Sequence, residues 1–107
     1  MILTNTKCMS SDLLRKQQAF ENVVTRHYPK WIVDPKFILS ASRTVGDIQV
    51  GITKDYEEFM WAAGAYIVGD DNEADIDDEI PGSYRTDLRG VPAAIKYAET
   101  FLPKEAD

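Results

Sequence analysis

Carboxylate groups are the side chains with the clearest chemical potential in this sequence, because most of the charge imbalance lies in one short stretch. Residues 70–79, which we call the acidic segment, hold seven acidic side chains and no basic one. The 107 residues contain 18 acidic and 12 basic side chains, so 11 acidic and 12 basic ones lie outside this segment. Carboxylates this dense are typical of two kinds of site, a Ca²⁺-binding loop and a surface that attracts Lys and Arg side chains.

A calcium loop of the EF-hand type can be tested by position. It needs oxygen ligands at positions 1, 3 and 5, glycine at position 6 and glutamate at position 12. Counted from Asp71, position 6 is Ile76 and position 12 is Gly82, and counting from Asp75 fails at the same two positions. The acidic segment therefore does not predict an EF-hand, and a weak divalent-cation site remains only a minor alternative.

Other catalytic and cofactor chemistry finds little support. The chain has one cysteine, Cys8, and one histidine, His27, which are too few for a zinc site. They could form a nucleophile–base pair, but His27 is explained more simply as a cation at the end of a predicted helix. Glu57 and Glu58 are more simply the solvated side of a helix than an acid–base pair. No glycine-rich phosphate loop occurs, so we expect no enzyme activity, no cofactor and no metal.

Direct binding to nucleic acid or to a membrane is also disfavoured. Basic residues are not clustered, and phosphate recognition requires a basic face. The aromatic residues Trp31, Trp61 and Tyr66 lie in apolar runs, which favours core packing over base stacking. Arg85 and Arg89 flank Asp87 and are expected to pair with the acidic segment or cap a turn. No apolar run approaches the roughly 20 residues that span a bilayer, and a single cysteine with no secretory signal favours the cytoplasm.

The elements that must position these groups predict one α+β domain over residues 1–107. A helix is predicted over 11–27, because Ser11 and Asp12 suit a helix start and Pro29 ends it. A second helix is predicted over 92–102, with Pro92 in its first turn. Each helix has one apolar stripe, in which Phe20 and Ile95 should be buried.

An antiparallel hairpin is predicted between the helices. Residues 37–42 and 48–53 alternate apolar and polar side chains, which is typical of half-buried strands. In the first strand, Phe37, Leu39 and Ala41 should share one face. Residues 43–47 should connect the strands, with Gly46 taking any positive φ. The sheet would have two or three strands, with both helices packed on the same face.

Residues 55–68 fit two interpretations. Asp55 to Glu58 resembles a capping box, which slightly favours a helix that ends at Gly64 and is followed by a short strand over 65–68. Alternatively, residues 59–68 form a long third strand rich in aromatic side chains. Residues 69–90 lack clear periodicity and are predicted to be a long acidic loop, of the kind that is usually functional or mobile.

The sequence favours a small non-enzymatic module that binds a protein with a Lys/Arg-rich surface. In its sharpest form, the acidic segment mimics nucleic acid and inhibits a nucleic-acid-binding complex, as small phage- and mobile-element-type inhibitors do; this is an analogy of class. The predicted partner-binding residues are the acids of the segment and three apolar neighbours: Asp70, Asp71, Glu73, Asp75, Ile76, Asp77, Asp78, Glu79, Ile80 and Tyr84.

Two alternatives remain open. The runner-up is a structural or oligomerising subunit, including a homodimer, whose acidic loop only keeps it soluble. A small enzyme or a weak metal-binding domain is the third class.

Overall fold

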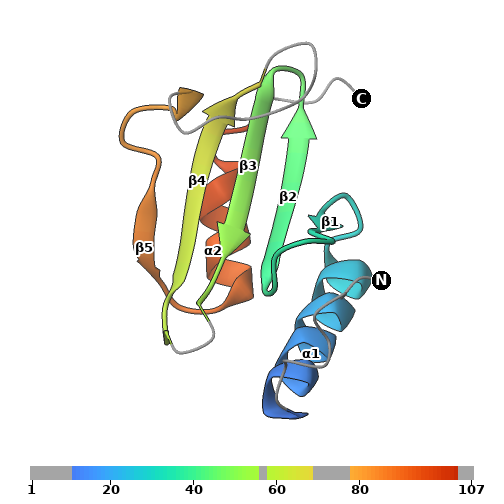
Figure 1. Ribbon diagram of the computed structural model, residues 1–107. Helices are drawn as coiled ribbons and strands as arrows, with labels where there is room; N and C mark the ends of the chain where they lie inside the picture. The colour runs from blue at the N-terminus through green and yellow to red at the C-terminus, as the bar shows by residue number, and fades with distance from the viewer. Residues whose placement is uncertain (1–10, 56–57, 69–77, 104–107) are drawn as a thin grey trace.

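The computed structural model describes residues 11–55, 58–68 and 78–103, and these form two helices and five antiparallel strands (Figure 1). The strands follow the order β1-β2-β3-β4-β5, so each strand pairs with its neighbour in the sequence. This meander confirms the α+β class. The sheet has five strands rather than the two or three predicted, because the 55–68 region and the stretch before the last helix each contribute a strand.

The first helix, α1, spans Ser11–His27, as predicted. Phe20 and Val24 are buried in its stripe, and the Phe20 ring stacks on Trp61 with ring centroids 5.2 Å apart. Gln17 is also buried, and its Oε1 accepts a hydrogen bond of 2.7 Å from the backbone N–H of Leu39. One amide therefore fixes the helix to the start of the sheet, since a buried polar group must find a partner.

The strand predicted over 37–42 is displaced along the chain. β1 is short, Ile32–Val33, and β2 runs over Ser40–Val45. Between them Asp34 Oδ1 accepts hydrogen bonds from the backbone N–H groups of Lys36 at 2.7 Å and Phe37 at 3.0 Å. This Asx-type turn takes N–H groups that a strand would need. Phe37 is consequently 67% exposed and does not share the buried face of Leu39 and Ala41, which corrects the prediction.

The hairpin that follows matches the alternation of the sequence. β3 spans Ile48–Thr53, as predicted, and pairs with β2 in antiparallel register. Val45 faces Ile48, so the connection is the two-residue turn Gly46-Asp47 rather than the whole of 43–47. Gly46 has φ 61°, the left-handed conformation that glycine adopts without strain.

The slightly favoured helix over 55–63 is wrong, and the alternative strand is confirmed in a shorter form. β4 spans Trp61–Ile67 and pairs with β3 over residues 62–67, with Ile52 opposite Ala63. Phe59, the first residue of the predicted strand, lies outside β4 and is 79% exposed. The capping pattern is a local signal, whereas the pairing with β3 satisfies a full ladder of backbone hydrogen bonds.

The last two elements complete the layers. β5, Arg85–Leu88, lies inside the 69–90 stretch that was predicted to be a loop. α2 spans Val91–Glu99, shorter than the predicted 92–102, and buries Ala94, Ile95 and Ala98. It lies across β3 and β4 (Figure 1).

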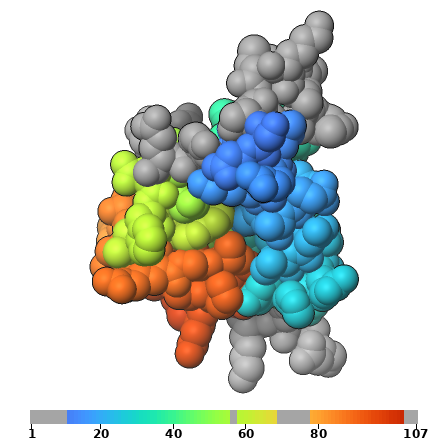
Figure 2. Space-filling model, turned by 90° about the horizontal axis from the view of Figure 1, so that it is seen from below, coloured from blue at the N-terminus to red at the C-terminus, as the bar shows by residue number. Residues whose placement is uncertain are grey.

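The two helices do not cover the sheet equally. α2 covers the face that carries Val50, Ile52 and Ala65, all of which are buried. α1 contacts β1 and lies off the lower end of the sheet in Figure 1, and Figure 2 shows it packed beside that end and the start of α2. The prediction of two helices on one face is therefore correct only for α2. No helix of the described ranges covers the opposite face of β2–β3–β4, which we call the open face.

Candidate functional site

The predicted partner-binding residues divide into two groups. Six of them lie outside the described residues: Asp70, Asp71, Glu73, Asp75, Ile76 and Asp77. The other four lie at the return of the acidic segment to the sheet. Asp78 is exposed, Tyr84 is 53% exposed, and Glu79 and Ile80 are half-buried. Ile80 packs against the core, so Tyr84 is the apolar neighbour among the described residues that is open to a partner.

Both flanks of the acidic segment are hydrogen-bonded to the sheet. On the entry side, the backbone N–H of Val68 donates to the carbonyl of Asp47 at 2.8 Å. On the return side, the N–H of Ile80 donates to the carbonyl of Ala65 at 2.8 Å, and Glu79 forms an isolated antiparallel bridge with Tyr66. The segment therefore leaves and rejoins the fold at fixed points near the end of β4.

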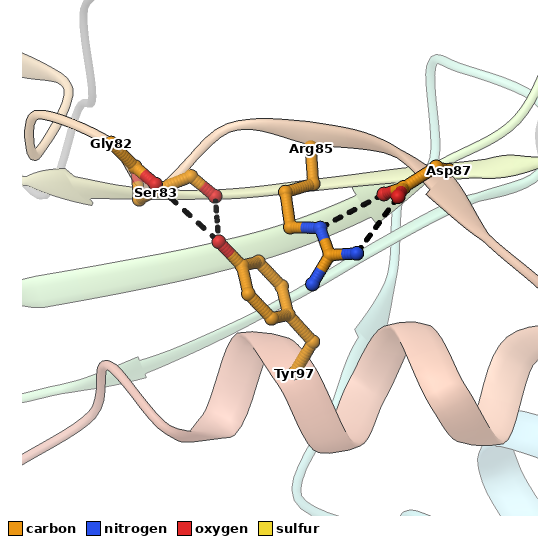
Figure 3. A network of polar contacts seen from close by, with 5 residues as sticks. All are labelled: Gly82, Ser83, Arg85, Asp87 and Tyr97. Atoms are coloured by element: carbon orange, nitrogen blue, oxygen red, sulfur yellow. Dashed lines mark hydrogen bonds and ion pairs between the residues drawn. The ribbon is translucent and has the colours of Figure 1, made fainter.

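Ser83 strengthens the return side. Its side chain is fully buried, and its Oγ accepts from the N–H of Ala65 at 3.1 Å and donates to the carbonyl of Ala65 at 3.2 Å. The hydroxyl takes the place of a strand partner next to the irregularity between β4 and β5. The Tyr97 hydroxyl on α2 donates to the Ser83 carbonyl at 2.8 Å (Figure 3). The return side is thus tied to both β4 and α2.

Arg85 lies over the same part of α2. Its guanidinium donates two hydrogen bonds of 2.8 Å to the Asp87 carboxylate and lies 5.0 Å from the centre of the Tyr97 ring (Figure 3). The hydrogen bond from Arg85 lowers the pKa of Asp87, and the same bond raises the pKa of Arg85. Arg85 therefore pairs with Asp87, its neighbour on β5, and not with Asp78 or Glu79, while the other acids of the segment lie outside the described residues.

Tyr66 connects the acidic segment to the open face. The pKa of its phenol is raised, first by burial and then by the negative charge of Glu79 and the neighbouring Tyr84. The phenol therefore stays neutral at physiological pH. Glu79, the last acid of the segment, places its charge beside an aromatic side chain of the open face.

The open face contains a hollow of about 420 Å³. In its floor Gly51 lies directly opposite Gly64 on β4 and opposite Ser42 on β2. Phe37 lines the hollow on the β2 side, and Tyr66 and Tyr84 line it on the β4 side. This hollow is not predicted by the sequence pattern, although a glycine inside a strand is a known signal of close approach by another group.

The charged groups around the hollow are mainly acidic. Asp34, Lys54 and Asp55 line it. The Lys54 ammonium is directed away, because it donates to the Glu58 carbonyl at 3.2 Å and lies 6.0 Å from the centre of the Trp61 ring. Among the described lining residues, the two carboxylates are therefore the charged groups that remain at this rim.

Within the described part of the chain, no three His, Cys, Asp or Glu side chains gather closely enough to hold a metal ion. No described helix is long and apolar enough to cross a membrane. His27 is exposed at the end of α1, while Cys8 and Glu57 lie outside the described residues.

Comparison of the chain with known protein families, with curated proteins and with solved structures gave no match.

Proposed function

We propose that this chain is a small non-enzymatic module that docks its acidic segment on a Lys/Arg-rich surface of a protein. The sharpest form of the proposal is inhibition of a nucleic-acid-binding complex, in which the seven acids occupy the surface that phosphates would occupy. The observation that carries the proposal is the hydrogen-bonding of both flanks to the sheet at Asp47 and Ala65. Ends that are fixed before binding lower the ordering cost of the segment on association.

Charged and apolar contacts would contribute to binding in different ways. Exposed ion pairs contribute only about 0–1 kcal/mol each, so the acids mainly speed association and fix orientation. Affinity would come from apolar side chains next to the segment. Tyr84 and Ile67, both 53% exposed, are the described residues placed to supply it.

The runner-up is an oligomerising subunit with a solubilising acidic segment. Ile32 and Phe37 support it, since they are 68% and 67% exposed on neighbouring parts of the chain. Apolar side chains exposed together are typical of an interface. Sedimentation of the purified protein distinguishes this alternative from the proposed function, because self-association would appear without any partner.

Partner capture with matched variants tests the proposal. The bait is the wild type, the triple variant Asp75→Asn/Asp77→Asn/Asp78→Asn, or a control with the same charge change elsewhere, Asp12→Asn/Glu21→Gln/Asp107→Asn. We expect a basic protein to be captured from the native host by the wild type and the control, and to be lost or depleted with the triple variant. Equal capture by all three baits would mean that the acidic segment does not bind the partner and only keeps the protein soluble.

A further inference from the structure

Gly51 is not required by the backbone of β3. Its φ lies outside the left-handed region, and an added Cβ would meet only the Ala41 carbonyl oxygen, at 3.6 Å, an ordinary contact. Glycine in the interior of a central strand weakens the sheet, because it adds backbone entropy to the unfolded chain and no side-chain packing. The described fold therefore does not explain why residue 51 is glycine. A hollow that must stay open for an incoming group would explain it.

Gly64, opposite Gly51, has a different environment. A Cβ there would lie 3.3 Å from the Tyr66 hydroxyl and 3.4 Å from Tyr84 Cδ1, so the two tyrosines lean over it. The free space is thus above Gly51, between these tyrosines and Phe37. A hollow with walls on two sides suits a side chain that projects from a macromolecule better than a free small molecule, which is normally enclosed over most of its surface.

The charges around the hollow indicate which class of molecule can bind there. Asp34 and Asp55 line the rim, Glu79 acts on the Tyr66 wall, and Lys54 is directed toward Trp61. This arrangement repels a nucleic acid, and it repels a second copy of a chain whose net charge is −6. It is complementary to a segment that carries Lys or Arg on either side of an apolar residue.

We propose that the open face binds a cationic amphipathic segment of the partner, with one apolar side chain seated over Gly51 and flanking Lys or Arg side chains at Asp34 and Asp55. This inference rests on the proposed function in that both make the partner basic. It adds a second contact surface, which is continuous with the acidic segment through the Glu79–Tyr66 bridge.

The probe is a synthetic amphipathic peptide of Lys and Leu, about 18 residues long so that it can form a helix. Its counterparts replace Lys by Glu, or Leu by Ser. Binding is measured by fluorescence anisotropy at physiological ionic strength, and the site is located by amide chemical shifts. We expect the Lys–Leu peptide to bind and to shift the amides of Ser42, Gly51 and Gly64, whereas the Glu–Leu and Lys–Ser peptides bind at least about tenfold more weakly.

The decisive variant is Gly51→Val, which fills the hollow, and Thr44→Val is its control on the same sheet face outside the hollow. Gly51→Val should weaken the Lys–Leu peptide at least about tenfold and Thr44→Val by less than about twofold. Should Gly51→Val misfold, Gly51→Ala should still weaken binding more than Thr44→Val does. Asp34→Asn/Asp55→Asn, which keeps an oxygen acceptor at the turn, should weaken binding severalfold and reduce its salt dependence.

Three results would overturn the inference: unchanged affinity of Gly51→Val, equal binding of the Glu–Leu peptide, or equal binding of the Lys–Ser peptide. If amide shifts were confined to residues 70–80 and Gly51→Val bound the peptide with unchanged affinity, the open face would be excluded as the binding site and the acidic segment would remain. If Gly51→Val lost binding and the acidic triple variant kept it, the open face would be supported as the binding site and the acidic segment would be excluded.

Discussion

The Ser83 hydroxyl hydrogen-bonds both backbone groups of Ala65, at 3.1 Å and 3.2 Å, across 18 residues of sequence. This buried side chain, together with the Ile80 N–H that donates to the Ala65 carbonyl at 2.8 Å, therefore closes the loop that contains the acidic segment. The fixed return of this segment depends on it, together with the Tyr97 hydroxyl bonded to the Ser83 carbonyl.

Ser83→Ala should lower the free energy of unfolding by about 1–3 kcal/mol, because it leaves the buried N–H of Ala65 without its partner, while the Ala65 carbonyl keeps its hydrogen bond from the Ile80 N–H. It should also speed hydrogen exchange at the Ala65 amide. Ser40→Ala, which removes a more exposed hydroxyl contact with Thr53, should cost less than about 1 kcal/mol. Equal effects of the two variants in urea denaturation would contradict the closing role of Ser83.

Asp87 should titrate below the usual range of a carboxyl, because the guanidinium of Arg85 hydrogen-bonds it. The folded pKa is lower than the unfolded one, so the stabilisation is present above the unfolded pKa and is lost as the pH falls through the folded value. Since both groups are exposed, the effect on stability is small. Carboxyl chemical shifts should show the Asp87 pKa returning to its usual range in Arg85→Gln, and an unchanged value in that variant would contradict the pairing.

Two glycines in the β2–β3 hairpin should respond to alanine in opposite directions. Gly51→Ala should raise the free energy of unfolding by about 0.5–1 kcal/mol, since its backbone accepts a Cβ and the unfolded chain loses entropy. Gly46→Ala should lower it by about 1–2 kcal/mol, because φ 61° is strained for any residue with a Cβ. Thermal denaturation of the two variants compares them directly, and destabilisation by Gly51→Ala would mean that the strand needs glycine.

Core truncation should be costly on either helix. Phe20 is 4% exposed and Ile95 is 1% exposed, so replacement of either by Ala should cost about 2–5 kcal/mol. Phe20→Ala should also change the near-UV circular dichroism, because the ring stacks on Trp61. A shift below about 1 kcal/mol for either variant in denaturant would place that side chain outside the core.

Local signals predicted the elements that depend on local chemistry. The bounds of α1 follow from its hydroxyl-rich start and from Pro29, and β3 follows from the alternation of Ile48, Val50 and Ile52. Long-range pairing decided the rest. The capping pattern at Asp55 favoured a helix, but the pairing of Trp61–Ile67 with β3 produced a strand. β5 has little strand signal of its own, and forms where Leu88 pairs with Trp61.

The candidate site divides in the same way. The acidic segment is visible in composition alone. Its attachment is not, because Ser83 and Ala65 meet only once the register of β4 is set. The hollow is likewise hidden in the sequence, since Gly51 and Gly64 lie on different strands and become neighbours only through the β3–β4 register.

The central claim is that the acidic segment steers a basic partner onto the protein, and the salt dependence of the association rate tests it most directly. Stopped-flow association of the captured partner should slow steeply for the wild type as ionic strength rises to physiological values, because screening acts on exposed charges. The triple variant Asp75→Asn/Asp77→Asn/Asp78→Asn should associate more slowly at low salt and show a flatter slope. The control Asp12→Asn/Glu21→Gln/Asp107→Asn should keep most of the wild-type slope. An unchanged rate and slope in the triple variant would contradict the claim.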